Sequence, residues 1–320
     1  MKTLCTAYCI LCAITALLFA VAALCRHLAL RAERRNERRF ARQYMNLIAQ
    51  RMLDPDGVPM SQFPMCERRG ARKVLARLLT AASSACFEEP AALRRMAAAN
   101  GIEGWLLRKV RLSHGYNRAR YLAMLSTLPV SPPTAEYISR YGSHSDRRTA
   151  FKTMLVTIAS DPAETVRILM RFPHTLTPLE MAELTAMLRR GLLPIAYAPL
   201  LGSQNRNLRM LGLNIVRIFG ITESEQLLLQ LLADSNPHPE ACRFRDETVY
   251  VMMSLHLPVS RRQTAAHIRS MSPLSRRALL RRLAAEGYSV TALTRLAQED
   301  EQHYAETLAA SYKRTLVCGT

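Results

Sequence analysis

The sequence has few of the signals that mark β-strands. Alternating runs of Val, Ile and Thr are scarce, and so are the short turns that join hairpin strands. From Met65 onward, apolar residues recur at helical spacing instead, as in Val74, Leu75, Leu78 and Leu79. An all-α fold is therefore predicted. Its first helices after the N-terminal region are expected over residues 67–86, 88–99 and 102–112.

Motifs that carry catalysis or bind cofactors are also missing. The sequence contains no Gly-rich phosphate-binding loop, no His-Glu-x-x-His, no Gly-x-Ser-x-Gly and no cluster of Cys and His at ligand spacing. Its eight histidines are dispersed. His256 and His267 are placed to approach each other across a repeat, although packed or surface histidines explain them more simply. We therefore predict that the protein is not an enzyme, and we expect no catalytic residue, cofactor, metal or small-molecule substrate.

The eight cysteines do not form a disulfide framework. Four lie in an apolar N-terminal stretch (Cys5, Cys9, Cys12, Cys25), and four are far apart in the rest of the chain (Cys66, Cys86, Cys242, Cys318). Cys9-x-x-Cys12 has the spacing of a metal or redox pair, but its place in an apolar stretch favours simple packing. This distribution agrees with a reducing, cytoplasmic location for most of the chain.

Residues 1–25 are predicted to be an uncleaved membrane anchor. Charged residues are absent from Thr3 to Cys25, and these 23 positions are enough for a helix to cross a hydrocarbon core of ~30 Å. Arginines follow at once, and basic residues that flank an apolar span stay on the cytoplasmic side. We expect a single-pass protein of the inner (cytoplasmic) membrane, with its N-terminus outside and its C-terminal domain in the cytoplasm.

A cleaved signal peptide is the alternative for the same residues. Ala20-Val21-Ala22 has the small-x-small pattern of a cleavage site. The apolar stretch is long for a signal peptide, and Lys2 is the only charge that precedes it. In this alternative, the rest of the chain is an exported periplasmic binding module.

Positive charge is concentrated directly after the apolar stretch. The net charge is +19, and residues 26–120 hold 20 Lys and Arg against 8 Asp and Glu, whereas residues 121–320 hold 23 against 17. Anionic lipids attract such segments by about 1 kcal/mol per basic side chain near the surface. Residues 26–64 are therefore expected to form a basic juxtamembrane helix (Arg31–Leu53) and a linker that begins at Asp54-Pro55-Asp56-Gly57. The predicted lipid-headgroup ligands are Arg26, Arg31, Arg34, Arg35, Arg38 and Arg39.

The chain matches itself when it is shifted by 30 residues. Five positions align in this way: Arg118, Tyr121, Met124, Leu125 and Leu128 with Arg148, Phe151, Met154, Leu155 and Ile158. A shift of 60 residues aligns Phe151, Leu155 and Ile158 with Leu211, Ile215 and Ile218. A period near 30 that contains two amphipathic helices is typical of an α-solenoid, in which each helix pair buries its apolar face against the next.

Two stretches of the chain resemble HEAT repeats. The better one is LLGSQNRNLRMLGLNIVRIFGITESEQLLLQLLAD, residues 200–234, and HSDRRTAFKTMLVTIASDPAETVRILMRF, residues 144–172, is a looser copy. The resemblance covers residues 112–297, although Pro178, Pro194 and Pro199 interrupt one copy. It implies a HEAT-like α-solenoid of helix pairs over residues 65–316, preceded by the single transmembrane helix. HEAT-like proteins are mostly scaffolds and binding platforms, and the resemblance implies the same role for this chain.

Four arginines form the clearest basic patch of the repeat region: Arg276, Arg277, Arg281 and Arg282. On a helical wheel, the last three point away from the apolar side of their helix. We predict that Arg277, Arg281 and Arg282 contact an acidic partner or lipid headgroups. A solvated outer face is the alternative explanation.

Together these features predict a bacterial scaffold or adaptor that binds a protein partner at the cytoplasmic membrane face. A membrane-bound envelope enzyme is a partner suggested by location alone. The alternative from another class is a HEAT-like DNA glycosylase that grips duplex DNA, which the net charge favours. The anchor opposes it, and so does an aromatic content of 6%; nucleic acid is therefore not the expected partner.

Overall fold

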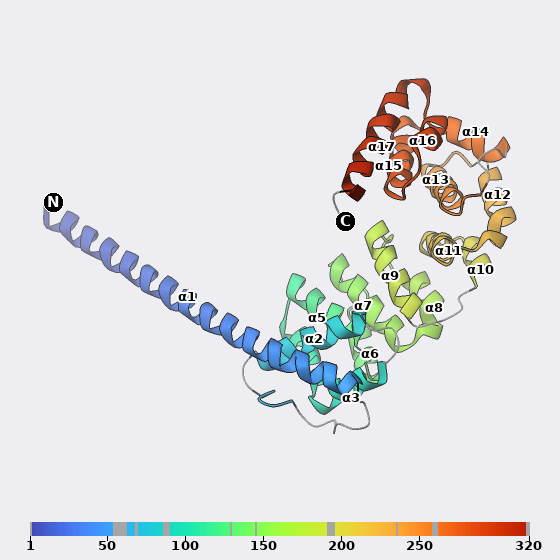
Figure 1. Ribbon diagram of the computed structural model, residues 1–320. Helices are drawn as coiled ribbons and strands as arrows, with labels where there is room; N and C mark the ends of the chain where they lie inside the picture. The colour runs from blue at the N-terminus through green and yellow to red at the C-terminus, as the bar shows by residue number, and fades with distance from the viewer. Residues whose placement is uncertain are drawn as a thin grey trace. The chain divides into compact units, whose positions relative to one another are not determined.

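The computed structural model describes residues 2–53, 63–67, 70–85, 90–128, 130–144, 146–190, 196–234, 236–257 and 262–317. Every regular element among these residues is helical, so the predicted all-α fold is confirmed (Figure 1). The chain divides into two compact units, Met1–Thr165 and Val166–Thr320. This division differs from the single repeat domain expected over residues 65–316.

Unit 1 is built from seven α-helices and one short 3₁₀ helix among its described residues. They are α1 (Lys2–Leu53), α2 (Ala71–Ala85), α3 (Pro90–Ala99), α4 (Ile102–Leu112), α5 (Gly115–Thr127), α6 (Pro132–Ser139), α7 (Arg147–Ser160) and η1 (Pro162–Glu164). Helix α4 has the bounds that the sequence predicts, whereas α2 and α3 begin later than expected.

The stop between α3 and α4 lies at Asn100-Gly101, as predicted. Gly101 has a φ of 60°, a left-handed conformation that favours glycine. The side chain of Asn100 closes the turn, because its Nδ2 donates to the Met96 carbonyl at 2.8 Å and its Oδ1 accepts from the Phe63 N–H at 2.7 Å. The buried amide therefore joins the end of α3 to the segment that follows α1.

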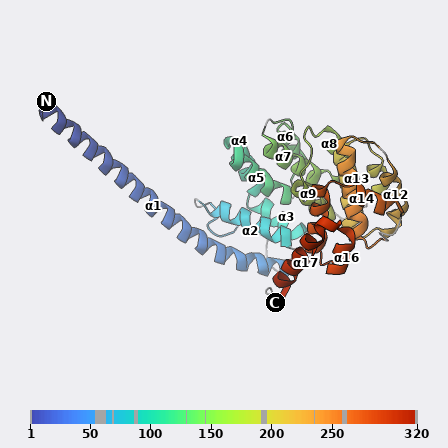
Figure 2. The ribbon, with the colours of Figure 1, turned by 90° about the horizontal axis from the view of Figure 1, so that it is seen from above.

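Helix α1 runs without interruption from the predicted anchor into the core of unit 1 (Figure 2). The helix expected over Arg31–Leu53 is confirmed, while the predicted stop at Asp54-Pro55-Asp56-Gly57 lies outside the described residues. Phe40, Tyr44 and Ile48 are buried at intervals of four residues. They pack in one apolar cluster with side chains of α2, α3, α4 and α5. The C-terminal part of α1 therefore contributes buried side chains to the core of unit 1.

Specific polar and aromatic contacts fix the end of α1 in place. The Tyr44 hydroxyl donates to the Pro64 carbonyl at 2.9 Å, and its ring meets the Phe63 ring edge to face, with centroids 5.3 Å apart. Glu37, on the same helix, forms ion pairs with Lys73 at 2.7 Å and with Arg77 at 3.6 Å. Both basic partners lie on α2, so α1 and α2 are joined by charge as well as by apolar packing.

Unit 2 consists of short helices that follow one another closely. They are α8 (Thr165–Arg171), α9 (Pro178–Arg190), α10 (Tyr197–Leu201), α11 (Arg206–Phe219), η2 (Thr222–Ser224), α12 (Glu225–Ala233), α13 (Pro239–Ser254), α14 (Arg262–Ser270), α15 (Pro273–Ala285), α16 (Val290–Leu296), η3 (Glu299–Glu301) and α17 (Gln302–Val317). The better HEAT-like copy, residues 200–234, contains α11, η2 and α12.

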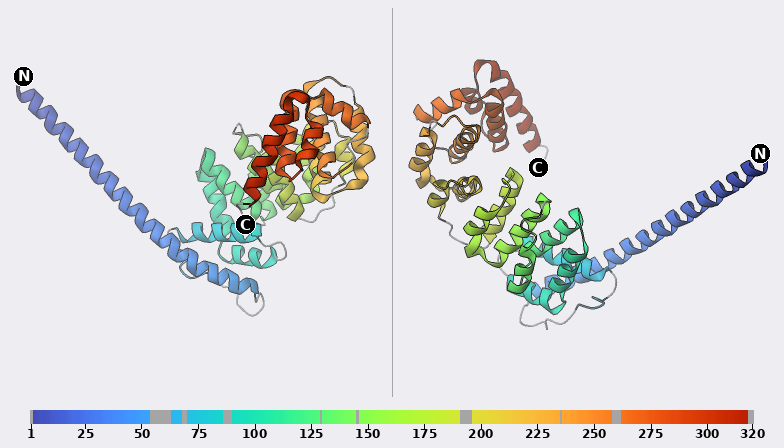
Figure 3. Two further views of the ribbon diagram at one scale, coloured as in Figure 1. Left: turned by 45° about the horizontal axis from the view of Figure 1, so that its top comes forward. Right: turned by 180° about the vertical axis from the view of Figure 1, so that it is seen from behind.

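Alternate helices of unit 2 pack against one another. Helix α9 contacts α11, α11 contacts α13, α13 contacts α15, and α15 contacts α17; α12 contacts α14 in the same way. Both views of Figure 3 show the later helices of this unit, coloured gold to red, lying side by side. Leu213, Val216, Val249, Leu280 and other buried side chains form a core that runs through these helices.

Each unit contains a buried arginine that makes the same pattern of hydrogen bonds. Arg118 is the fourth residue of α5, and its Nε donates to the carbonyls of Val110 at 3.3 Å and Ser113 at 2.9 Å. Arg276 is the fourth residue of α15, and its Nη1 donates to carbonyls at the same two offsets, at 3.4 and 3.0 Å. Each arginine thus bonds carbonyl groups at the end of the preceding helix, which have no partner within that helix.

Candidate functional site

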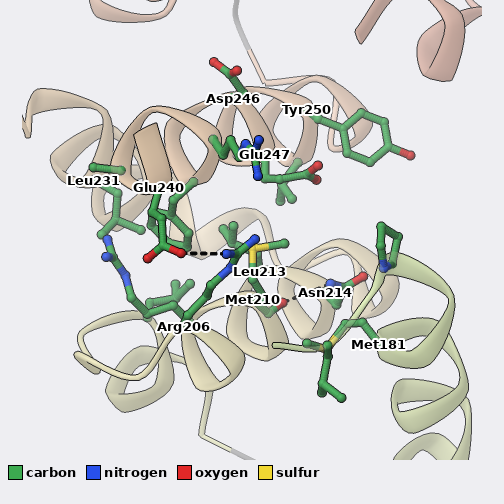
Figure 4. Close-up of a pocket in the computed structure, with 18 of the residues that line it drawn as sticks. Met181, Arg206, Met210, Leu213, Asn214, Leu231, Glu240, Asp246, Glu247 and Tyr250 are labelled. Atoms are coloured by element: carbon green, nitrogen blue, oxygen red, sulfur yellow. Dashed lines mark hydrogen bonds and ion pairs between the residues drawn. The ribbon is translucent and has the colours of Figure 1, made fainter. Parts of the chain in front are cut away.

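Unit 2 contains a groove with a volume of about 810 Å³, within the range of ligand-binding pockets. Helices α9, α11, α13 and α15 supply most of its walls, and the residues that line it all lie between Leu176 and Arg282 (Figure 4). We call this cavity the inner groove. Both apolar and charged side chains line the inner groove. They include Met181 of α9; Arg206, Arg209, Met210, Leu213, Asn214 and Arg217 of α11; Leu231 of α12; Asp234; Glu240, Arg243, Phe244, Asp246, Glu247 and Tyr250 of α13; and Arg282 of α15.

Apolar and neutral side chains of α11 form the middle of the inner groove. Leu213 is buried and Met210 is half-buried, and both are seen beside Asn214 in Figure 4. The Asn214 Nδ2 donates to the Met210 carbonyl at 2.9 Å, which fixes this amide within its own helix. Met181 of α9 continues the apolar surface on one side. Of these apolar side chains, Met210 is the one with substantial exposed surface in the groove.

Three acidic side chains of α13 line the inner groove, and each has a basic partner in the same unit. Arg206 Nη1 lies 2.8 Å from Glu240 Oε1, the ion pair drawn in Figure 4, and Arg282 Nη1 lies 2.6 Å from Glu247 Oε1. Asp246 Oδ1 lies 2.9 Å from Nε2 of His267. These ion pairs and this hydrogen bond join neighbouring helices, and they leave the three carboxylates with partners inside the protein.

Arginines of the groove also stack on aromatic rings of α13. The guanidinium carbon of Arg209 lies 3.8 Å from the Phe244 ring centroid, and that of Arg282 lies 3.4 Å from the Tyr250 centroid. Burial lowers the pKa of Arg209. Burial, together with a hydrogen bond from its hydroxyl to Glu286, raises the pKa of Tyr250. Cation–π contact of this kind holds a guanidinium in place without using its hydrogen-bond donors.

The predicted partner-binding arginines of α15 divide between two places. Arg282 lines the inner groove, where it has the contacts just described. Arg277 and Arg281 are exposed and turn toward α17: Arg277 lies over the Tyr304 ring at 5.6 Å, and Arg281 Nη2 donates to the Tyr304 hydroxyl at 3.2 Å. Arg276, which the sequence placed in the same basic patch, is instead buried.

The predicted lipid-binding arginines are carried by α1. Arg31, Arg35, Arg38 and Arg39 are exposed, whereas the side chains of Arg26 and Arg34 lie outside the described part of the structure, as do those of residues 1–18. Among the described residues, no helix is both long enough and apolar enough to cross a membrane. The four exposed arginines precede the buried part of α1 and lie on the same continuous helix.

His256 and His267 contact different residues, which agrees with the simpler explanation of packed or surface histidines. His267 contacts Asp246, as given above, whereas the His256 ring stacks on Tyr288 with centroids 5.6 Å apart. Each histidine therefore has a different neighbour. Among the described residues, no group of three or more His, Cys, Asp or Glu side chains is arranged to hold a metal ion.

Trp105 is half-buried, packs against the core of unit 1, and meets the ring of Tyr121 edge to face, with centroids 6.0 Å apart. Lys109 lies 5.8 Å from its ring. The tryptophan therefore joins α4 to α5 at the edge of the core.

Sequence reasoning did not find Arg209, Phe244 and Tyr250. The interacting residues of α11, α13 and α15 are 34–36 positions apart, as in Arg206–Glu240 and Tyr250–Glu286. The self-match at 30 residues does not align them.

No family model, curated protein or solved structure matches the chain.

Proposed function

We propose that the protein is a membrane-anchored scaffold that binds a protein partner at the cytoplasmic face of the membrane. The observation that carries this proposal is α1, because one helix holds both the uncharged stretch of residues 3–25 and the core side chains Phe40, Tyr44 and Ile48. In this proposal residues 3–25 are the anchor. A helix that enters the core of unit 1 then attaches the folded units to it directly.

The packing of unit 2 supports a HEAT-like solenoid. In such a fold each helix pair packs only on its neighbours, so alternate helices form rows. The contacts from α9 through α11, α13 and α15 to α17 follow this rule. The inner groove runs across that row, and extended surfaces of this kind suit a protein partner. A membrane-bound envelope enzyme remains the partner suggested by the proposed location.

The exposed arginines of α1 support a contact with anionic lipid headgroups. Arg31, Arg35, Arg38 and Arg39 lie within fourteen residues of Cys25, the end of the uncharged stretch. The nearby acid Glu37 is paired with Lys73 and Arg77 of α2, which leaves these arginines without an acidic partner among the described side chains. Surface arginines beside an anchor gain from the negative potential of the cytoplasmic leaflet.

Topology is tested first on the full chain in intact spheroplasts. Protease added outside should leave the two units uncut, and mass spectrometry of the purified protein should find residues 1–25 still attached. Digestion of the units from outside, or loss of the N-terminal residues, contradicts the proposed orientation and favours the exported module.

Lipid contact is tested by charge reversal of the exposed arginines. Replacement of Arg35, Arg38 and Arg39 by Glu should weaken association of the chain with phosphatidylglycerol vesicles under conditions in which the uncharged stretch is held in detergent. Replacement of Arg94, Arg95 and Arg108 by Glu is the matched control, since these arginines are also exposed in unit 1. Equal effects of the two triple replacements contradict a specific role of α1.

A further inference from the structure

The unpaired charge of the inner groove is positive. Glu240, Asp246 and Glu247 have the basic partners described above, whereas Arg209 and Arg243 have no ion pair among the described residues. Asp234 lies near Arg209, but its carboxylate accepts the Asn236 N–H at 3.0 Å. Once the internal pairs are formed, the groove therefore offers free guanidinium groups and one exposed carboxylate at its edge.

Arg209 is the better placed of the two free arginines. It is half-buried and rests on Phe244, so its position is fixed while its N–H donors stay free of any carboxylate. Partial burial strengthens any ion pair formed there, because the surroundings screen charge less than water does. Arg243 is exposed on α13 and adds positive potential without a fixed position.

Apolar surface lies next to this arginine. Met210, the next residue of α11, and Leu231 of α12 both line the groove and are half-buried. A ligand that meets Arg209 with a carboxylate therefore meets thioether and aliphatic groups with its neighbouring atoms. A free phosphate has no apolar part, whereas a peptide with an acidic residue beside apolar residues has both.

We propose that the inner groove binds a short peptide segment of a partner protein in which an acidic side chain pairs with Arg209 and adjacent apolar side chains pack on Met210 and Leu231. The inference rests on the proposed scaffold function and names the chemistry of the partner. The volume of about 810 Å³ suits a segment of a few residues. Internal pairing of Glu240 and Glu247 disfavours a basic segment, which has no free carboxylate to meet on α13.

The test uses the full chain in detergent and a displayed library of random octapeptides. Peptides enriched on the wild-type protein should contain Asp or Glu next to apolar residues. A selected peptide should bind Arg209→Gln about tenfold more weakly, as expected for the loss of a hydrogen-bonded charge pair. Arg209→Lys should recover part of the loss, and Arg209→Glu should bind the same peptide when its acidic residue is replaced by Lys. Arg295→Gln changes an exposed arginine outside the groove and should bind like wild type.

Two results overturn the inference while leaving the scaffold proposal intact. One is enrichment of peptides without acidic residues, or equal binding by wild type and Arg209→Gln when circular dichroism shows both folded. The other is displacement of the selected peptide by phosphatidylglycerol vesicles or inorganic phosphate in a manner that depends on Arg209, which assigns the arginine to a lipid headgroup or a free phosphate. Recovery of the chain from the soluble fraction with residues 1–25 intact contradicts the scaffold proposal itself, whatever the groove binds.

Discussion

Removal of the Arg276 side chain should destabilise unit 2 more than removal of its counterpart Arg118 destabilises unit 1. Arg276 is 1% exposed, and its Nε lies 2.5 Å from Oε2 of Glu301, a carboxylate that is fully buried. Its Nη2 donates to Gln298 at 2.8 Å, in addition to the two carbonyl bonds at the end of α14. Arg276→Met removes all four bonds and leaves the buried Glu301 carboxylate with one weaker ionic partner, Arg277, whose Nε lies 3.6 Å from Oε1.

The expected loss of unfolding free energy follows from breaking this buried ion pair. Breaking a buried ion pair by removing one partner costs about 3–5 kcal/mol. Arg118 makes the same two carbonyl bonds but faces the rings of His114 and His144 instead of a carboxylate. Arg118→Met therefore loses hydrogen bonds without stranding an anion, which costs about 1–3 kcal/mol. The difference between the two variants isolates the contribution of the buried carboxylate.

Urea unfolding of the full chain, followed by circular dichroism and by hydrogen exchange of peptides from each unit, measures both effects. A second variant, Arg276→Met with Glu301→Leu, removes both charges and should recover most of the lost stability, because a well-packed apolar pair replaces a buried ion pair at little cost. If Arg276→Met is no worse than Arg118→Met, or if the double variant is as unstable as the single one, the reasoning fails.

Three further predictions concern Asp146, Cys66 and Tyr44 of unit 1. Asp146 caps α7, and a hydrogen bond from the Thr149 hydroxyl at 2.6 Å helps to lower its pKa; Asp146→Ala should cost about 1 kcal/mol. Because the folded-state pKa is the lower one, this stabilisation is present above the ordinary aspartate pKa and is lost as the pH falls through the folded value, which urea unfolding across acidic pH will show. Burial raises the pKa of the Cys66 thiol, so iodoacetamide should label it more slowly than half-buried Cys242 in peptide-level mass spectrometry of the native chain. Burial also raises the pKa of Tyr44 to about 12, and the difference between the absorbance titrations of wild type and Tyr44→Phe should place its ionisation there.

Local rules predicted much of the helical structure. The scarcity of strand signals gave the all-α class, and Asn100-Gly101 marked the end of α3 because glycine adopts a left-handed turn easily. Phe40, Tyr44 and Ile48 recur every four residues, a pattern that indicates a buried helix face. The many arginines around them favoured a lipid-facing segment instead. Composition therefore concealed a spacing that was present in the sequence.

The inner groove is formed by contacts between different helices, and the sequence pattern of one helix does not predict which residues of another helix it meets. Phe244 lies 35 residues after Arg209, and Glu247 lies 35 residues before Arg282, so each contact depends on the lengths of the intervening turns and of a whole helix. Arg276 illustrates a second limit. An arginine beside other arginines is normally solvated, and its burial follows from Glu301, which is 25 residues away on η3.

Because α1 is continuous, the number of residues between the proposed anchor and the first core residue determines where the core of unit 1 lies. Fifteen residues separate Cys25 from Phe40, which corresponds to a rise of about 22 Å in a helix. If residues 3–25 cross the bilayer as proposed, a continuous helix holds Phe40 at that distance from Cys25. It also fixes the direction in which the core of unit 1 faces around the axis of α1. Insertion of a single alanine in this interval would lift unit 1 by about 1.5 Å and turn it by about 100°, so the direction from which a neighbouring membrane protein is met is encoded in chain length.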